Sequence, residues 1–288
     1  MTPRSKRLFI LVTILTGLST LGCGMFVDRA VNRAMGKAAD KVGERVGGAI
    51  ADNVIGGLRP EMMYLYTMNV FRVLFYHGGY YVSSLSYEPL EYTRWEASNV
   101  EQGDWFERTL MHRYSDGSEW WRVESRQKDE DDKEVTLIME ALLSKPQDNG
   151  TRQIRRMRAM FPGEKEAREI GITEGDANKW VLSSNRSLTK ESMKGMSKGR
   201  KTVKVPAGTF SATHLQMKGY NDFSHLDWYL SKEVPGQVVK YRNVTKDGDE
   251  QKVDWNIELL AHGKSEAVSK LGVNVQDNDP ENKDDNLE

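Results

Sequence analysis

The feature that most constrains the fold is an alternation of apolar and polar residues with a period of two, which begins near Tyr80 and recurs until residue 261. Successive side chains of a β-strand point to opposite faces of its sheet, so this pattern is typical of strands with one buried and one exposed face. In residues 252–261 the apolar positions are Val253, Trp255, Ile257, Leu259 and Ala261. The pattern predicts a mainly β domain.

Turn residues separate these segments. Pro and Gly fall where tight turns need them in 205–210 (VPAGTF) and 234–236 (VPG), and Asp247-Gly248 is a third hairpin turn. Helices do not alternate regularly with the strands, so we expect antiparallel neighbours. We predict an α+β, mainly β fold: an open, curved antiparallel sheet (a half-barrel) of about eight to ten strands with a covering helix, preceded by a long N-terminal helix.

Three segments depart from the alternation. Residues 61–77 are strongly apolar and predict a buried helix, although their aromatic and β-branched content leaves a strand open. In 152–170, arginines surround Ile154 and Met157, which indicates a short basic amphipathic segment. Residues 189–204 are rich in Gly, Ser and Lys, as in an exposed loop. We predict four regions: a signal peptide (1–22), an amphipathic helix (23–59), a β domain (60–265) and an acidic disordered tail (266–288).

The N-terminus predicts export. A basic leader is followed by an uncharged apolar run, 8–15, and then by small residues before Cys23, which is the layout of a secretory signal and too short for a persuasive membrane span. Residues 20–23 (TLGC) resemble a bacterial lipobox, although Thr20 and Leu21 depart from its usual order. The resemblance implies cleavage before Cys23 and attachment of acyl chains such as palmitate to its thiol. An ordinary secretory signal with a chance cysteine is the alternative.

A lipid on Cys23 would anchor the chain to a membrane of the bacterial cell envelope, with the domain in the periplasm. Gly24, where Asp favours inner-membrane retention, points to the outer membrane. In the helix predicted for 26–57, small residues recur four apart and would let another backbone approach closely: Ala39, Gly43, Gly47 and Ala51. This ridge suggests a homo-oligomer or docking to an envelope complex; a simple helical tether is the alternative.

Composition excludes several classes. With 41 basic and 42 acidic residues the chain lacks the basic excess of a nucleic-acid binder. One cysteine allows neither an internal disulfide nor a multi-thiolate metal site. The five histidines are scattered without metal-ligand spacing, and no nucleophile, phosphate-loop or dinucleotide motif is present. We therefore expect no enzyme activity, no cofactor and no metal.

Tryptophans are the candidate ligand-binding residues. Trp120 and Trp121 are adjacent, so on a strand they point to opposite faces, and we expect one in the core and the other outside or in a binding concavity. The full candidate set is Trp95, Trp105, Trp120, Trp121 and Trp228, for which plain core packing is the alternative. The candidates for contact with anionic headgroups or a partner are Arg152, Arg155, Arg156 and Arg158.

Two phrases, KVPAGTF (204–210) and WYLSKEVPGQVVK (228–240), together with the leader and helix, resemble bacterial envelope lipoproteins of the LolA/LolB-like type. The resemblance implies a curved sheet that cradles helices around an apolar cavity for acyl chains, with 152–170 as a helix over the sheet. The first hypothesis is a membrane-anchored, non-enzymatic binding module for a lipid, lipoprotein or other amphiphile. The alternative is a structural or assembly lipoprotein that acts through its glycine-ridged helix.

Overall fold

The computed structural model describes residues 67–68, 70–72, 74–75, 87–97, 105–128, 134–147, 151–172, 181–182, 190–218, 224–247, 250–266 and 269–275. The elements are β1 (Glu91–Ala97), β2 (Trp105–Arg113), β3 (Glu119–Lys128), β4 (Glu134–Leu143), β5 (Arg152–Met160), β6 (Arg168–Glu169), β7 (Val181–Leu182), α5 (Lys190–Met196), β8 (Ser197–Val205), β9 (Gly208–Lys218), β10 (Ser224–Leu230), β11 (Val238–Asp247) and β12 (Glu250–Lys264). The predicted signal peptide and N-terminal helix, with Cys23 and the small-residue ridge, lie outside the described residues.

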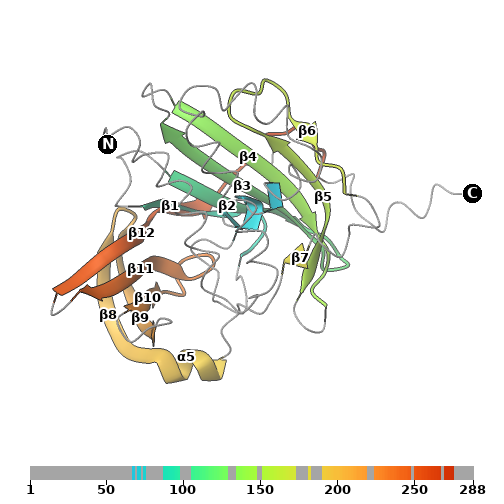
Figure 1. Cartoon of the computed structure of the whole chain (residues 1–288). Coiled ribbons are helices and arrows are strands. Elements are labelled where there is room, and N and C mark those ends of the chain that lie inside the picture. Colours follow the sequence, from blue (N-terminus) through green and yellow to red (C-terminus); the bar gives the residue numbers. More distant parts are fainter. Residues whose placement is uncertain are drawn as a thin grey trace, which may run out of the picture.

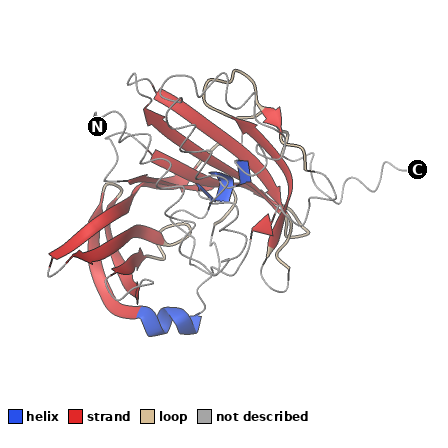
Figure 2. Ribbon diagram, in the orientation of Figure 1, coloured by secondary structure: helices blue, strands red, loops and turns tan. Residues whose placement is uncertain are grey.

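The strands form one antiparallel sheet in the order β6-β5-β4-β3-β2-β1-β12-β11-β10-β9-β8, with β7 paired to β5. It consists of two meanders, β1–β6 and β8–β12, which are joined where β1 pairs with β12 (Figure 1). This pairing connects residues far apart in sequence, such as Thr93 and His262. The predicted open antiparallel, mainly β sheet is confirmed, with 12 strands rather than eight to ten. Figure 2 shows how little of the described chain is helical.

The basic segment 152–170 forms strands β5 and β6 with a turn between them, and the prediction of a helix lying over the sheet is wrong. Ile154 and Met157 are three residues apart, as on a helix face, and both are buried. In the pairing of β5 with β4, Arg155 has no opposite residue, so a β-bulge lets both apolar side chains reach the core. Because of the bulge, two buried residues of a strand are three positions apart, which is the spacing expected of a helix.

The expected loop 189–204 is also ordered differently: it contains α5 and most of β8. β8 is the last strand of the sheet, and only Val203 and Val205 of its side chains are buried. An edge strand with one neighbour and little buried surface keeps the Lys- and Gly-rich composition of a loop, which explains the incorrect expectation.

Helical residues 67–68, 70–72 and 74–75, here called helical segment 67–75, cover one face of β2–β5. Phe75 packs edge-on against Trp121 of β3, with ring centroids 5.2 Å apart, and stacks on Phe71 at 5.5 Å. Phe71 is fully buried. The prediction of a buried helix in 61–77 is confirmed for these residues. Within the described part of the chain, no helix is long and apolar enough to cross a membrane.

A second core lies in the β8–β12 half. Trp228 stacks on Tyr241 of the neighbouring strand with centroids 5.2 Å apart. Trp95 of β1 belongs to this core and donates a hydrogen bond from Nε1 to the Val238 carbonyl at 3.2 Å. Phe106 of β2 packs against both cores, so the centre of the sheet joins two separately built hydrophobic clusters.

The turn before β11 offers a test of this packing. Gly236 has φ of +69°, and a Cβ added there would lie 2.7 Å from Tyr87 Cε2 and 2.9 Å from Arg108 Nη2. We expect Gly236→Ala to lower the free energy of unfolding by about 2 kcal/mol or more, because both the backbone and the contact are unfavourable. Urea denaturation measures the change.

Gly195→Ala is the matched control. Gly195 lies in α5, and no atom would approach its added Cβ within 4 Å. Alanine favours a helix over glycine by up to ~1 kcal/mol, so this variant is expected to be unchanged or more stable. Equal destabilisation by the two substitutions would contradict the close approach at Gly236.

Candidate functional site

The least expected side chain of the sheet is Arg108. It lies in the middle of β2, on the same face as Phe106 and Leu110, and is fully buried. Its opposite residue on β3 is Val123, which is also fully buried. A guanidinium stays charged in a protein, so the apolar face of the sheet contains a permanent positive charge.

Aromatic rings surround this charge. The guanidinium carbon lies 5.5 Å from the ring centroid of Phe75, 5.0 Å from Tyr87, 5.5 Å from Trp95 and 5.8 Å from Trp121. The faces of these rings carry partial negative charge and attract a cation, more strongly when water is excluded. We call Arg108 and these four rings the Arg108 box.

Neutral oxygen atoms complete the box. Nη2 of Arg108 donates to the Tyr87 hydroxyl at 2.9 Å, and Nη1 donates to the Phe75 carbonyl oxygen of helical segment 67–75. Among the described residues no carboxylate forms an ion pair with Arg108. Burial of a cation without an anion costs several kcal/mol, and the rings and the two oxygens reduce that cost.

The chemistry of the box fits an anion. A guanidinium presents a planar set of N–H donors that fits a carboxylate or a phosphate with two parallel hydrogen bonds. In the structure the Phe75 carbonyl and the Tyr87 hydroxyl occupy these donors. An anion would have to replace them, which requires movement of helical segment 67–75 or of Tyr87.

Two of the five predicted ligand-binding tryptophans, Trp95 and Trp121, line the box, and both are fully buried. The adjacent pair lies on opposite faces as expected, with Trp121 in one core and Trp120 in another cluster. Trp120 is also fully buried, so the expected exposed position is wrong, and the alternative of a binding concavity stays a prediction. Trp228 is in the second core. Only Trp105 is partly exposed, with the Arg94 guanidinium 4.1 Å from its ring centroid.

The four predicted headgroup-binding arginines lie on β5 and face acidic side chains of this chain. Arg152 lies 3.1 Å from Glu119, Arg156 lies 2.8 Å from Glu169, and Arg158 lies 3.4 Å from the same Glu169. Arg155 is exposed and 3.9 Å from Asp116. A headgroup or partner would compete with these internal pairs.

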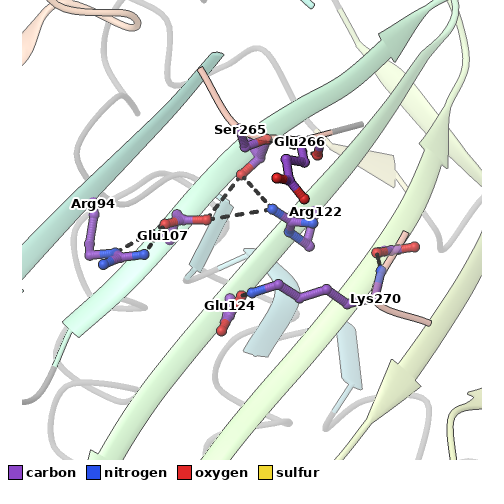
Figure 3. Close-up of polar contacts among 9 residues, drawn as sticks. Arg94, Glu107, Arg122, Glu124, Ser265, Glu266 and Lys270 are labelled. Atoms are coloured by element: carbon purple, nitrogen blue, oxygen red, sulfur yellow. Dashed lines mark hydrogen bonds and ion pairs between the residues drawn. The ribbon is translucent and has the colours of Figure 1, made fainter. Parts of the chain in front are cut away.

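The face of β1–β4 opposite to the box is charged, and all but Arg94 of its charged residues named here are buried. Figure 3 shows Arg94, Glu107 and Arg122 in a row across β1, β2 and β3. Arg94 Nη2 lies 2.7 Å from one oxygen of Glu107, and Arg122 Nη2 lies 3.7 Å from the other. Arg122 is opposite Glu140 of β4 in the register, so charges alternate along the row. We call these four residues and Glu124 the polar face.

Residues 269–275, here the C-terminal segment, cover the polar face. Lys270 donates from its backbone N to Glu140 at 3.0 Å and from Nζ to Glu124 at 2.5 Å. The buried apolar residues of the segment are Leu271, Val273 and Val275, and the last two pack with Trp120. The prediction of a disordered tail from residue 266 therefore does not hold for 269–275. The three apolar residues at alternate positions in 271–275 are the sequence signal that could have predicted an ordered, packed segment here.

A second buried polar cluster lies on β9–β11. Asp227 is fully buried and accepts hydrogen bonds from Arg242 at 2.8 Å and Gln216 at 3.1 Å, and it lies 2.8 Å from His214 Nε2. His225 Nε2 is 3.5 Å away. The sequence showed only scattered histidines, whereas the β9–β10 register brings His214 and Asp227 together. Among the described residues no group of His, Cys, Asp and Glu side chains could hold a metal ion.

Sequence reasoning did not select Arg108, although the alternation contains it. Phe106 and Leu110 are the apolar positions of β2, and Arg108 is the residue between them with the same parity. A charged residue at an apolar position of the alternation was the signal that could have identified Arg108 from the sequence. Its aromatic partners come from elements distant in sequence, which periodicity could not bring together.

Comparisons with known proteins assign no family. No family model matches the chain, and no curated protein matches it. Among solved structures, the crystal structure of MucB is similar with a TM-score of 0.35 and 10% sequence identity, covering 65% of this chain and 57% of that chain. The matched part thus spans little more than half of the MucB chain. The likeness to LolA/LolB-like proteins stays a prediction, because similarity at this level identifies no fold family.

The Asp227 cluster predicts how stability depends on pH. Burial alone would raise the pKa of Asp227, but hydrogen bonds from His214, Arg242 and Gln216 outweigh it and hold the pKa below the ordinary 3.8. The ionised carboxylate therefore stabilises the fold above the unfolded-state pKa, and this contribution is lost as the pH falls through the lower folded-state pKa.

We expect Asp227→Asn to lower the free energy of unfolding by ~2 kcal/mol at pH 7, since charge-assisted hydrogen bonds are lost. The difference from the parent protein should shrink below about pH 4. Urea denaturation at pH 7, 5, 4 and 3 measures it, with exposed Glu166→Gln as control. A difference that stays constant down to pH 3 would contradict the assignment.

Proposed function

We propose that this protein is a membrane-anchored, non-enzymatic binding module of the bacterial envelope, and that its ligand is an amphiphile with an anionic group. The ligand's carboxylate or phosphate would bind Arg108, and its apolar chain would lie between helical segment 67–75 and the apolar face of the sheet. A fatty acid or the acyl chain of a lipid has this chemistry.

The observation that supports the proposal is the buried charge of Arg108 among aromatic rings, with no described carboxylate paired to it. Ligand sites are mostly apolar, with a few polar groups that fix orientation. The box has this composition: one cation, two neutral oxygen partners and four rings. Of the large apolar side chains described, only Val253 is exposed. This favours an internal binding site over an exposed apolar surface.

The same contacts suggest how the site would open. Phe75 contributes both a ring and its carbonyl oxygen, so one residue of helical segment 67–75 closes the box. An anion that binds Arg108 releases that carbonyl and removes a tie between the helix and the sheet. The cost of moving the helix lowers affinity, and the charge-assisted hydrogen bonds to the anion offset it.

Fluorescent fatty-acid titration of the mature chain tests the site. We expect Arg108→Gln to weaken binding at least tenfold, because the anion loses its partner (a factor of 10 is about 1.4 kcal/mol). Tyr87→Phe should strengthen binding, because it removes one competing oxygen. The uncharged methyl ester of the same fatty acid should bind weakly and alike to all variants.

Exposed Lys165→Gln is the control and should bind like the parent protein. If Arg108→Gln fails to fold, the affinity of Tyr87→Phe still tests whether the anion binds at Arg108. Absence of uptake by the parent protein, or equal affinity for the acid and its methyl ester, would refute an anion-directed site.

The anchor is tested separately. We expect the full-length chain, expressed in a Gram-negative host, to incorporate labelled palmitate and to fractionate with membranes, and Cys23→Ser to abolish both, because a lipid on this thiol is what holds the chain. Unlabelled protein that is still exported would favour the ordinary secretory signal. Fatty-acid binding by the purified domain does not depend on this outcome.

A further inference from the structure

A second binding surface lies at the end of the sheet farthest from β6. β8 is the last strand in the sheet order, and within the described chain it pairs only with β9 (Figure 1). An edge strand presents backbone N–H and C=O groups that can pair with an added strand. The regular part of this template is 200–205, because Lys198 and Gly199 have no opposite residue on β9. Just after β8, the Ala207 N–H already donates to the Leu259 carbonyl of β12 at 3.0 Å.

The side chains of β8 are strongly basic. Lys198, Arg200, Lys201 and Lys204 are exposed, and none of them has a hydrogen-bond or ion-pair partner in the described chain. Arg200 and Lys204 have the same parity along the strand and Lys201 has the other, so cations flank the edge on both faces. From residue 190 to 218 the chain has seven basic residues and one acidic residue, Glu191.

This charge decides what the edge can accept. Lysines on an edge strand commonly prevent aggregation, and two copies of β8 placed side by side would set like charges opposite each other. The same charges favour an acidic strand, since cross-strand pairs of opposite charge are stabilising. The edge therefore repels a second copy of itself and attracts an acidic segment.

The acidic end of this chain is a poor candidate for that strand. Residues 277–288 are rich in Asp and Asn and contain Pro280, and these residue types are depleted in strands. A partner with acidic residues alternating with β-branched residues fits better, because its backbone can form the ladder while its carboxylates reach the lysines and arginine.

We propose that β8 binds an acidic polypeptide segment of a partner protein, which adds to the sheet as an extended strand. Main-chain hydrogen bonds would supply affinity, and the four cations would supply selectivity for acidic sequences. This surface is separate from the Arg108 box, so the protein would have one internal and one external binding site.

The experiment uses the mature chain and a fluorescein-labelled nonapeptide of alternating Glu and Val or Thr. We expect binding by fluorescence anisotropy, protection of the β8 amides from hydrogen–deuterium exchange, and at least a tenfold loss of affinity in the variant with Lys198, Arg200, Lys201 and Lys204 all changed to Gln. The control changes Lys145, Lys165, Lys232 and Lys264, which are equally exposed, and should leave affinity unchanged.

Three results would overturn the proposal. The first is peptide binding without protection of the β8 amides, or with equal loss in both quadruple variants, which would indicate general charge attraction. The second is binding of phosphatidylglycerol vesicles, lost in the β8 variant, without any binding of the peptide; this would assign the surface to lipid headgroups. The third is binding only after removal of residues 277–288, which would assign the edge to the chain's own tail. None of these results alters the fatty-acid titration.

Discussion

The buried guanidinium of Arg108 is the constraint on which the centre of this structure depends. It contacts helical segment 67–75 through Phe75, the chain before β1 through Tyr87, β1 through Trp95 and β3 through Trp121. Gly236 approaches the same group, and only glycine leaves room for it. A buried cation is costly, and no described carboxylate pairs with Arg108, so the surrounding oxygens and ring faces must stabilise it. This requirement fixes how the helix, the central strands and the turn meet.

The opposite face shows a different solution to burying charge. Glu107, Arg122 and Glu140 alternate in sign across neighbouring strands, and the C-terminal segment supplies further donors from Ser269 and Lys270. Each charge there has a neighbour of opposite sign, so the face can be covered without leaving an ion unpaired. On the apolar side the buried carboxylate of Glu119 is paired with Arg113 and Arg152, whereas no described carboxylate pairs with Arg108. That difference singles out Arg108 among the buried charges of the described sheet.

The alternation of apolar and polar residues predicted correctly the features of the fold that depend on local sequence. The alternation in β2, β4 and β12 and the hairpin turns at 205–210 and 234–236 led to an open antiparallel sheet. The bulge at Arg155 and the edge position of β8 depend on neighbours that the chain meets only after folding, so 152–170 and 189–204 were assigned incorrectly. The Arg108 box was not predicted for the same reason. The position of Arg108 on the apolar face of β2 could be read from the alternation, but the four rings around it come from four separate stretches of sequence.

A methionine or leucine at residue 108 would fill the core without a desolvated charge, and replacing buried ionic groups by apolar ones often stabilises proteins. Arg108 therefore has no advantage as a packing residue. Its stacked rings and its bonds to Tyr87 and Phe75 limit the cost but do not neutralise the charge. In the proposed function such a group would be useful to an anion, because its donors are already held in position by the surrounding side chains. The cost of burying this charge is thus the physical argument for the proposed anion site at Arg108.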